Sequence, residues 1–434
     1  MSDALEVWID SNLMPQCQVG TLYNHRGVVR FEYDKGWLQS GTAFALDPKL
    51  TLDEAPFFPG AGSTNFGVFL DSSPDRWGKK LMQRREALQA RDAKREPRDL
   101  QAWDFLIGVQ DQTRQGALRF RIKGTETFLG AEKNAAPPVT SLRELESVAK
   151  ALSNDKIDSL DDLRKWLAVL VAPGASLGGA RPKANFMESD KSLWIAKFPA
   201  ADDTMNTGLW EHVIHTLAQR ALIDVPKVRL ARFNSKHHTL CSKRFDRDVQ
   251  GRRIFYASAF TMLRKVENSE GASYLDIAQF IQTQGDPATI KSDLKQMFRR
   301  VAFNVAVANR DDHLRNHGFV LHATGWRLAP AFDVNPSPKQ EHVLSIDDID
   351  KRSDLSVVRS TAFMYGVGDT EADAIIDHVV GVVDGWEAEA EKQGLSPGEI
   401  LDLAPAFTAG ARYREKKTLP AAAGQAPRRR PRRP

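Results

Sequence analysis

The chain has 434 residues, 42% of them hydrophobic and 27% charged, which is the composition of a globular protein with two or three domains. It has no apolar run of the roughly 18 residues that a membrane helix needs and no secretory signal, so we expect a cytoplasmic protein without a membrane partner. Two cysteines are too few for a disulfide framework or a thiolate metal site.

The net charge of +4 is concentrated at the C-terminal end. Five arginines lie within the last seven residues: Arg428, Arg429, Arg430, Arg432 and Arg433. The rest of the chain therefore carries +4 − 5 = −1, without the basic excess of a general nucleic-acid-binding protein. Residues 419–434 predict a disordered tail, which is either simply solvated or holds an acidic partner or nucleic-acid phosphates.

Residues 1–135 predict a strand-rich module. Polar and apolar residues alternate over three ranges: 4–9, 19–34 and 116–122. A hairpin turn fits residues 24–27, and residues 81–95 have the pattern of a helix. A Pro-rich linker at 134–139 separates this module from the next part of the chain.

Residues 136–250 predict a second mixed part. We expect helices over about 142–152, 159–171 and 207–222. We expect strands over 182–188, 192–198, 227–233 and 238–244, with a glycine-rich turn at 174–180 before the first of them.

Residues 251–418 are mostly helical in pattern. Within 290–308 six apolar residues fall on one helical face: Leu294, Met297, Phe298, Val301, Val305 and Ala308. The predicted fold class is therefore α+β, with a strand-rich α/β N-terminal part and an all-helical C-terminal part.

A glycine-rich segment, Ser-Leu-Gly-Gly-Ala-Arg-Pro-Lys, covers residues 176–183. Gly178 and Gly179 let the main chain approach a phosphate closely, with N–H groups directed at the anion. The segment matches neither the GxGxxG nor the Walker A pattern, so an ordinary turn between helix and strand is the alternative.

Lys197 stands in an apolar strand, fourteen residues after Lys183. A strand lysine next to a glycine-rich loop is where kinases keep the cation that binds the α- and β-phosphates. Glu211, on the following helix, is placed to form an ion pair with it. The alternative is an edge-strand lysine whose amine reaches solvent.

The end of the last predicted strand reads Ser-Lys-Arg-Phe-Asp-Arg over residues 242–247. In a two-lobed kinase this position is the hinge, where main-chain groups bind the edge of adenine. A charged segment at a strand end is otherwise simply solvated.

The strongest signal is a polar turn after the helix of 290–308. Asp311 precedes Asn316 by five residues, and Asp333 follows Asn316 by seventeen. One aspartate can accept a proton from an attacking hydroxyl, while the asparagine and the second aspartate hold Mg²⁺ against phosphates. Each residue alone could cap a helix or a turn. Together they predict a phosphotransferase, whereas a metal hydrolase would need histidine ligands at matching spacing.

These motifs, in this order, resemble the HipA family of bacterial serine/threonine protein kinases, which are toxins of toxin–antitoxin pairs. The resemblance includes Arg244-Phe245-Asp246-Arg247, Asp-x-His-x-x-Asn from Asp311, and Phe332-Asp333. It covers nearly the whole chain, including the segment Asp-Ser-Ser-Pro-Asp-Arg-Trp-Gly at 71–78. It implies a bilobal kinase-like fold with Mg-ATP between the lobes.

The resemblance also implies four parts: an N-terminal module at 1–135, a kinase N-lobe at 136–250, a C-lobe at 251–418 and the tail at 419–434. It assigns ATP binding to Gly178, Gly179, Ala180, Arg181, Pro182, Lys183, Lys197, Lys243, Arg244, Phe245, His313, Leu314, Arg315, Asn316, Phe332 and Asp333. Asp311 would be the catalytic base, and Asn316 and Asp333 the Mg²⁺ ligands.

Ser176 falls at the family's autophosphorylation serine, where a phosphate moves the loop away from ATP and switches the kinase off. The family's partners are a helix-turn-helix antitoxin that binds operator DNA, and aminoacyl-tRNA synthetases as substrates. Asp333-Val334-Asn335 lacks the glycine of a DFG motif, so an ordinary activation-loop flip is not expected. Two other functions stay open: a small-molecule kinase of the same fold, and a catalytically silent corepressor that acts on DNA with its antitoxin.

Overall fold

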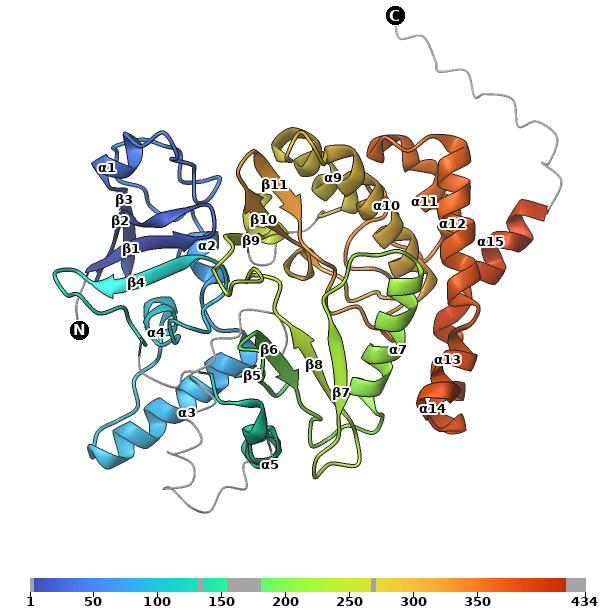
Figure 1. The fold of residues 1–434 in the computed structure, drawn as a ribbon, viewed down its shortest axis with the longest axis horizontal. Helices are drawn as coiled ribbons and strands as arrows, with labels where there is room; N and C mark the ends of the chain where they lie inside the picture. Colours follow the sequence, from blue (N-terminus) through green and yellow to red (C-terminus); the bar gives the residue numbers. More distant parts are fainter. Residues whose placement is uncertain (1–3, 132–135, 154–180, 267–270, 419–434) are drawn as a thin grey trace, which may run out of the picture.

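The computed structural model describes residues 4–131, 136–153, 181–266 and 271–418. Figure 1 shows a strand-rich N-terminal layer at one end of the molecule and a group of C-terminal helices at the other. The strands are β1 Ala4–Ser11, β2 Met14–His25, β3 Val28–Tyr33, β4 Leu118–Ile122, β5 Lys183–Met187, β6 Leu193–Lys197, β7 Val228–Ala231, β8 Thr239–Lys243, β9 Tyr256–Ser258, β10 Gly318–His322 and β11 Gly325–Leu328. The helices are α1 Lys35–Leu38, α2 Gly67–Asp71, α3 Arg76–Asp92, α4 Ala102–Ile107, α5 Leu142–Ser153, α7 Thr207–Arg220, α8 Ala259–Met262, α9 Tyr274–Gln284, α10 Ile290–Ala306, α11 Leu355–Ser360, α12 Asp369–Val383, α13 Trp386–Gln393, α14 Pro397–Leu403 and α15 Ala409–Thr418.

The first sheet is built from N-terminal residues in the order β3-β2-β1-β4, with all neighbours antiparallel. Leu5, Val7 and Ile9 alternate along β1 and are at most 1% exposed, as the two-residue period of a strand with one buried face requires. The predicted hairpin turn between β2 and β3 is present. Gly27 has a φ of 85°, and its N–H donates to the Asn24 side chain over 3.1 Å.

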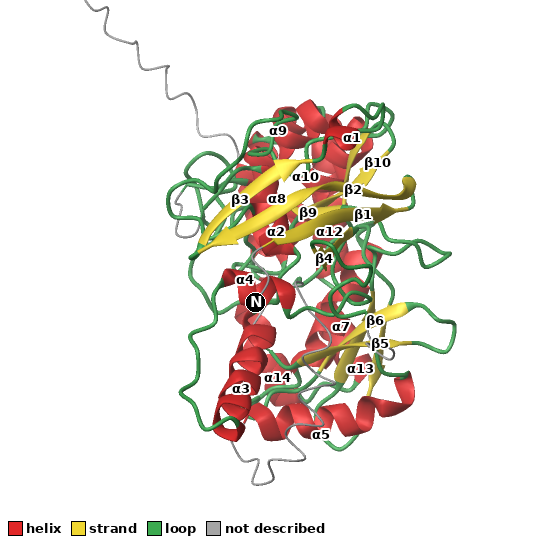
Figure 2. Ribbon diagram, turned by 90° about the vertical axis from the view of Figure 1, so that its left-hand side faces the viewer, coloured by secondary structure: helices red, strands yellow, loops and turns green. Residues whose placement is uncertain are grey.

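The second sheet has the order β5-β6-β8-β7 and two differently covered faces. One face carries Phe186 and Trp194, which belong to the same apolar cluster as Trp77 of α3 and Leu145 of α5. Figure 2 shows α3 and α5 below the first sheet, with α5 running beneath β5 and β6. The other face looks toward α7, so the remaining alternate side chains point into the space between sheet and helix.

A third sheet, in the order β11-β10-β9, lies in the part of the chain that the sequence predicts to be all-helical. β9 has three residues and β11 has four. Strands this short carry too few alternating positions to stand out from a helical background. At the start of β10, a Cβ on Gly318 would lie 2.3 Å from the Tyr256 ring, so only glycine fits there.

The long helix α10 leads the chain into the polar turn around Asp311. The six residues predicted to form its apolar face are all buried: Leu294, Met297, Phe298, Val301, Val305 and Ala308. This face packs against α9, α11 and α12. Ala308 has a φ of 51°, a left-handed conformation that ends the helical path and starts the turn.

Buried charges join the N-terminal module to the rest of the chain. Just after β8, Arg244 and Asp246 form an ion pair with side chains 1% and 2% exposed. Asp246 accepts a hydrogen bond from the Gly116 N–H over 2.8 Å, and Arg244 donates to the Thr113 carbonyl over 2.6 Å. Arg247 donates to carbonyls of the same segment, and burial lowers its pKa to about 9. These contacts fix the N-terminal module against the end of β8.

The structure thus has the mixed α and β architecture that the sequence predicts. Each sheet falls within one of the predicted parts 1–135, 136–250 and 251–418, whose boundaries stay predictions. The helix predicted over 159–171 and the tail 419–434 lie outside the described residues. No helix in the described part of the chain is long and apolar enough to cross a membrane.

Candidate active site

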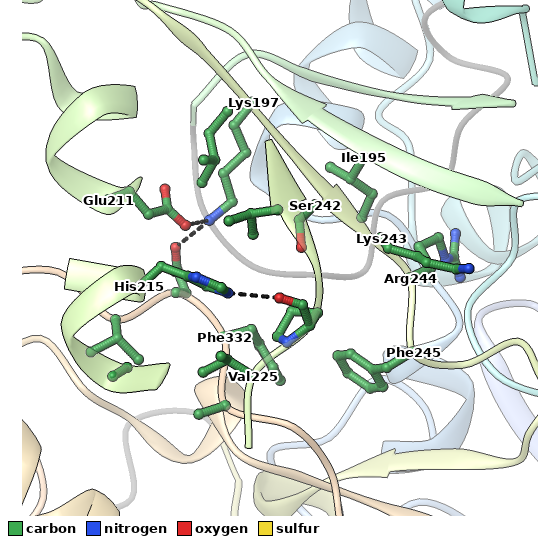
Figure 3. Close-up of a pocket in the computed structure, with 17 residues that line it drawn as sticks. Ile195, Lys197, Glu211, His215, Val225, Ser242, Lys243, Arg244, Phe245 and Phe332 are labelled. Atoms are coloured by element: carbon green, nitrogen blue, oxygen red, sulfur yellow. Dashed lines mark hydrogen bonds and ion pairs between the residues drawn. The ribbon is translucent and has the colours of Figure 1, made fainter. Parts of the chain in front are cut away.

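A pocket lies between the second sheet, α7 and the segment 331–334, with about 710 Å³ of free space when its opening to solvent is included. Figure 3 shows its side chains converging from these three sides. Most of the wall is apolar, with Ile195, Val228 and Leu240 from the sheet and Phe332 from the segment. Charged groups gather at one end. An apolar cavity with a few convergent polar groups is the usual form of a small-molecule site.

Strand and helix periods explain which side chains line this pocket. Ile195 and Lys197 alternate along β6, and Ser242 stands opposite Ile195 on β8. On α7, Glu211 and His215 are four residues apart, so they share the helix face that looks into the pocket.

The outer face of α7 is held by the C-terminal helices α13 and α14. The ring of Trp210 lies 6.1 Å from that of Trp386. The Asn206 N–H, at the N-terminus of α7, donates to the Glu399 side chain over 2.7 Å. Arg220, at the other end, pairs with Glu389 on α13. The helix that carries Glu211 is therefore fixed along its whole length.

Lys197 is the centre of the charged group at the end of the pocket. Its Nζ lies 2.5 Å from Glu211 Oε1 and 2.8 Å from Asp333 Oδ1. Figure 3 shows Lys197 and Glu211 pointing toward each other. The ion pair with Glu211 that the sequence predicts is therefore present. Burial alone would lower the pKa of Lys197, but the two carboxylates outweigh it and raise that pKa above its ordinary value. Lys197 is thus a fixed positive charge at neutral pH.

Asp333 is held in a strained main-chain conformation. Its φ of 57° lies in the left-handed region, which costs a residue other than glycine roughly 1 kcal/mol. Burial raises the pKa of its carboxyl group, but Lys197 and then His313 and Lys183 reverse this and lower the pKa below its ordinary value. Strain that surrounding contacts impose in this way is typical of functional sites.

The end of β8 closes the other side of the pocket. The main-chain N–H groups of Lys243 and Arg244 already donate to protein carbonyls over 2.8 and 3.0 Å. The Arg244 guanidinium is engaged in its buried pair with Asp246. Phe245 stacks on Phe332, with 5.6 Å between ring centroids and 29° between planes. These aromatic rings are therefore the groups best placed to meet a flat ligand at this end.

Two neighbouring aspartates in the turn after α10 have opposite environments. Asp312 is 2% exposed, and its Oδ2 makes hydrogen bonds of 2.7 to 2.8 Å with Tyr274, Asn304 and His317. The Asp311 side chain is 61% exposed and does not line the pocket. Asp312 therefore anchors the turn to the protein interior, and Asp311 is the carboxylate that a large partner can reach.

The 3-10 helix Leu314–Asn316 carries the second predicted metal ligand. Asn316 is 7% exposed, and its Oδ1 accepts no hydrogen bond from any residue that the structure describes. It lines a small pocket together with Phe332 and Val334, the two neighbours of Asp333. A buried carboxamide oxygen without a partner, close to a carboxylate segment, fits a hard cation such as Mg²⁺.

The other residues of this turn have different surroundings. Leu314 is buried in the core, and the guanidinium of Arg315 lies 3.8 Å from the centre of the Phe260 ring. His313 acts on the charge of Asp333, as described above. ATP contacts by His313, Leu314 and Arg315 stay predictions.

Arg181, Pro182 and Lys183 are the described end of the predicted phosphate loop. Arg181 pairs with Asp203, and the Pro182 carbonyl accepts a main-chain N–H over 2.9 Å. Lys183 Nζ lies 2.6 Å from Asp75 Oδ2, with both side chains buried. Phosphate binding by these residues stays a prediction. The rest of the loop lies outside the described residues: Ser176, Gly178, Gly179 and Ala180.

Two family models match the chain, the HipA N-terminal domain over residues 5–120 and the HipA-like C-terminal domain over residues 175–386. The chain belongs to the HipA family. It is similar to the serine/threonine-protein kinase toxin HipA of Shewanella oneidensis, with 24% identity over an alignment of 381 residues that covers 77% of each chain. The chain is therefore a kinase, as the sequence predicts.

The similarity of fold extends over nearly the whole HipA-family chain. The solved complex of HipA, HipB and operator DNA from Shewanella oneidensis contains a chain that superposes with a TM-score of 0.64 at 17% identity. The superposition covers 95% of this chain and 97% of that one. The predicted bilobal kinase-like fold is confirmed.

Two polar residues that line the pocket of this HipA-family chain, His215 and Ser242, were given no role by sequence reasoning. His215 Nε2 lies 2.6 Å from the Pro226 carbonyl, and burial lowers the pKa of the imidazole. Because it follows Glu211 by one helical turn, the helix period could have pointed to it. Ser242, two residues after Leu240, shares its strand face, so the strand period could have found it as well.

Proposed function

We propose that this HipA-family kinase transfers the γ-phosphoryl group of ATP to a serine or threonine hydroxyl of a protein, with Mg²⁺ as its cofactor. The observation that carries the proposal is the pairing of Lys197 with Glu211 and Asp333 at one end of an otherwise apolar pocket. Kinases bind the α- and β-phosphates with a strand lysine that a helix glutamate holds in place. The apolar remainder of the pocket has the size and surface for adenine.

In this proposal adenine lies between the apolar side chains of the second sheet and Phe332, with its edge toward Phe245. The N–H groups of Lys243 and Arg244 already have protein acceptors, so the main chain of Phe245 is the hinge contact we expect. The glycine loop covers the phosphates through Gly178, Gly179, Ala180, Arg181 and Pro182, and Lys183, whose amine binds Asp75, stands at its end.

Asp333 and Asn316 are the residues that would hold Mg²⁺. Both supply oxygen, and the Asn316 Oδ1 atom is buried without a partner among the described residues. In the described part of the chain, no group of three or more His, Cys, Asp and Glu side chains could hold a metal ion by itself. The phosphates of ATP would therefore complete the coordination. When bound, the ion neutralises charge on those phosphates.

Asp311 is the general base of the proposed reaction. It accepts the proton of the acceptor hydroxyl, a role that needs a carboxylate within reach of the substrate. The exposure of its side chain suits a protein acceptor, which must bring its hydroxyl to the surface of the kinase. The buried hydrogen bonds of Asp312 keep the turn in place during this approach.

We further propose that the kinase acts in the cytoplasm as a toxin, with a HipB-like helix-turn-helix antitoxin and, through it, operator DNA as partners. The assembly of Shewanella oneidensis HipA with HipB and operator DNA supports these partners. An aminoacyl-tRNA synthetase is the protein substrate that the family resemblance favours.

Autophosphorylation at Ser176 would switch the kinase off. A phosphate adds nearly two negative charges beside a loop that must receive the phosphates of ATP, so the two exclude each other. Ser176→Ala should keep or raise activity, whereas Ser176→Asp should weaken ATP binding. Equal nucleotide affinity of the two variants would contradict this control.

The central test is transfer of label from γ-labelled ATP·Mg²⁺, with and without cell lysate, by the wild type and by Asp311→Ala. We expect label on Ser176 and on one lysate protein, and its loss in Asp311→Ala. Label that reaches only small molecules would replace the proposal by a small-molecule kinase. The absence of any label that depends on Asp311 would favour a silent corepressor.

A further inference from the structure

Lys339 contacts the carboxylate that we propose as the catalytic base. Lys339 Nζ and Asp311 Oδ1 form an ion pair, with side chains 49% and 61% exposed. An exposed ion pair contributes only about 0–1 kcal/mol to stability. The contact therefore contributes little to the stability of the fold. Its main effect is on the charge and the orientation of the Asp311 carboxylate.

Hydrogen bonds tie the segment that carries Lys339 to the turn that carries Asp311. The N–H groups of Ser337 and Val343 donate to carbonyls of that turn over 2.9 and 3.0 Å. Arg310, the residue before Asp311, donates from its guanidinium to the Lys339 carbonyl over 2.8 Å. These hydrogen bonds hold the main chain around Lys339 next to the main chain around Asp311, so the two side chains lie close together in the fold.

The same turn is anchored on its far side. Arg310 Nε donates to the Ser353 hydroxyl over 3.1 Å. The buried His342 lies 3.0 Å from the same hydroxyl. Arg310 is therefore held from both sides, which fixes the main chain next to Asp311.

The chemistry of the base leaves one of its oxygens for such a contact. In the transfer, the acceptor Oγ–H gives its proton to one carboxylate oxygen, the Oγ–P bond forms, and the bond from the γ-phosphorus to the oxygen of ADP breaks. The second carboxylate oxygen takes no part. Lys339 holds Oδ1 of Asp311, which leaves Oδ2 for the acceptor hydroxyl.

We propose, on the basis of the function above, that Lys339 is a positioning residue for phosphoryl transfer. It fixes the Asp311 carboxylate so that Oδ2 faces the acceptor, and it keeps a positive charge beside the atoms between which negative charge moves. It acts on the step of transfer and not on nucleotide binding, because the pocket that holds Lys197 does not include it.

The test compares Lys339→Ala and Lys339→Arg with the wild type in steady-state phosphorylation of the acceptor found with labelled ATP·Mg²⁺. We expect Lys339→Ala to lower kcat by about 10- to 100-fold and to leave KM for ATP within about twofold. Lys339→Arg should recover most of kcat, because a guanidinium can also hold Oδ1. Lys417→Ala is the matched control, since Lys417 on α15 forms a similarly exposed ion pair with Asp377 and should keep full activity.

An unchanged kcat in Lys339→Ala would overturn the role of Lys339, and so would a raised kcat, which would mean that the lysine masks the base. The double variant Asp311→Ala/Lys339→Ala should be no less active than Asp311→Ala, because Lys339 acts only through Asp311. If Asp311→Ala keeps full activity, the proposed function fails first. If Asp311→Ala is inactive and Lys339→Ala is fully active, only the role of Lys339 fails.

Discussion

Two lysines stand opposite each other on the second sheet and have different partners. Lys183 on β5 is the register partner of Lys197 on β6. Lys183 binds Asp75 at the N-terminus of α3, where the side chains are 2% and 4% exposed. Lys197 binds Glu211 and Asp333 in the pocket. Lys183 thus joins the second sheet to the N-terminal module, and Lys197 lines the pocket.

The acids of the two pairs respond differently to their surroundings. Burial raises the pKa of Asp75, and Lys183 offsets this only in part. Burial also acts on Asp333, but Lys197 with its neighbours lowers the pKa of that carboxyl group. The same sequence pattern, a lysine in an apolar strand, can therefore give either a buried structural ion pair or a charged group in a pocket. The elements packed around the lysine decide between the two.

The largest effect is expected from Lys197→Met. Loss of the phosphate-binding cation should lower kcat/KM for ATP by roughly 1000-fold, which corresponds to about 4 kcal/mol. The melting temperature should also fall, because the carboxylates of Glu211 and Asp333 lose the cation that they share. Phosphorylation kinetics and thermal unfolding measure the two quantities. Full kinase activity of Lys197→Met would contradict the proposal that Lys197, unlike Lys183, binds the nucleotide.

Lys183→Met should act mainly on stability. It leaves the Asp75 carboxylate buried without its partner, so we expect the free energy of unfolding to fall by about 3 kcal/mol. Denaturant titration measures this loss, and the added change Asp75→Asn should restore part of it. Loss of nucleotide binding with unchanged stability would instead support the predicted contact between Lys183 and ATP.

Glu211→Ala tests whether the pocket lysine must be held by both carboxylates. Without Glu211, Asp333 remains as a partner, so Lys197 keeps its charge but loses its fixed position. We expect nucleotide affinity and turnover to fall by roughly tenfold each. The helix α7 is fixed by its outer face, and circular dichroism should therefore be unchanged. Unaltered affinity and turnover would remove Glu211 from the site.

The smallest effect is on the dependence of stability on pH. The lowered pKa of Asp333 contributes stability above its unfolded value of 3.8, which is lost as the pH falls through the folded pKa. The raised pKa of Asp75 has the opposite sign, since the folded state takes up its proton first and gains stability as the pH falls toward 3.8. Asp333→Asn and Asp75→Asn should therefore change the acid limb of unfolding in opposite directions.

Local patterns in the sequence account for much of the fold. The residues of α7 and α10, and the alternation along β5, β6 and β8, follow from periods of 3.6 and 2 that are visible within one element. The ion pair of Lys197 with Glu211 could be predicted from the sequence, because the two residues are fourteen positions apart on consecutive elements.

Other features depend on contacts that no local pattern encodes. Lys183 and Asp75 are 108 residues apart, and Asp75 is also the helix cap of α3, so nothing in its own segment marks it as the partner of a lysine. Lys339 stands in a segment without regular structure, and only the folded turn brings it to Asp311. The short strands of the third sheet were not predicted for a similar reason, because they are defined by their pairing with one another and not by a periodic pattern in the sequence.

The packing of α13 and α14 against α7 has a consequence for how this kinase can be regulated. Many kinases are turned off by an outward swing of the helix that carries the lysine-binding glutamate. Here such a swing would separate Trp210 from Trp386 and break the bond between Asn206 and Glu399. These supports come from residues at and beyond the end of the matched C-terminal family model, at residue 386. These contacts disfavour an outward displacement of α7 as an off-switch, so we expect inhibition to act on a part of the site that does not contact the C-terminal helices.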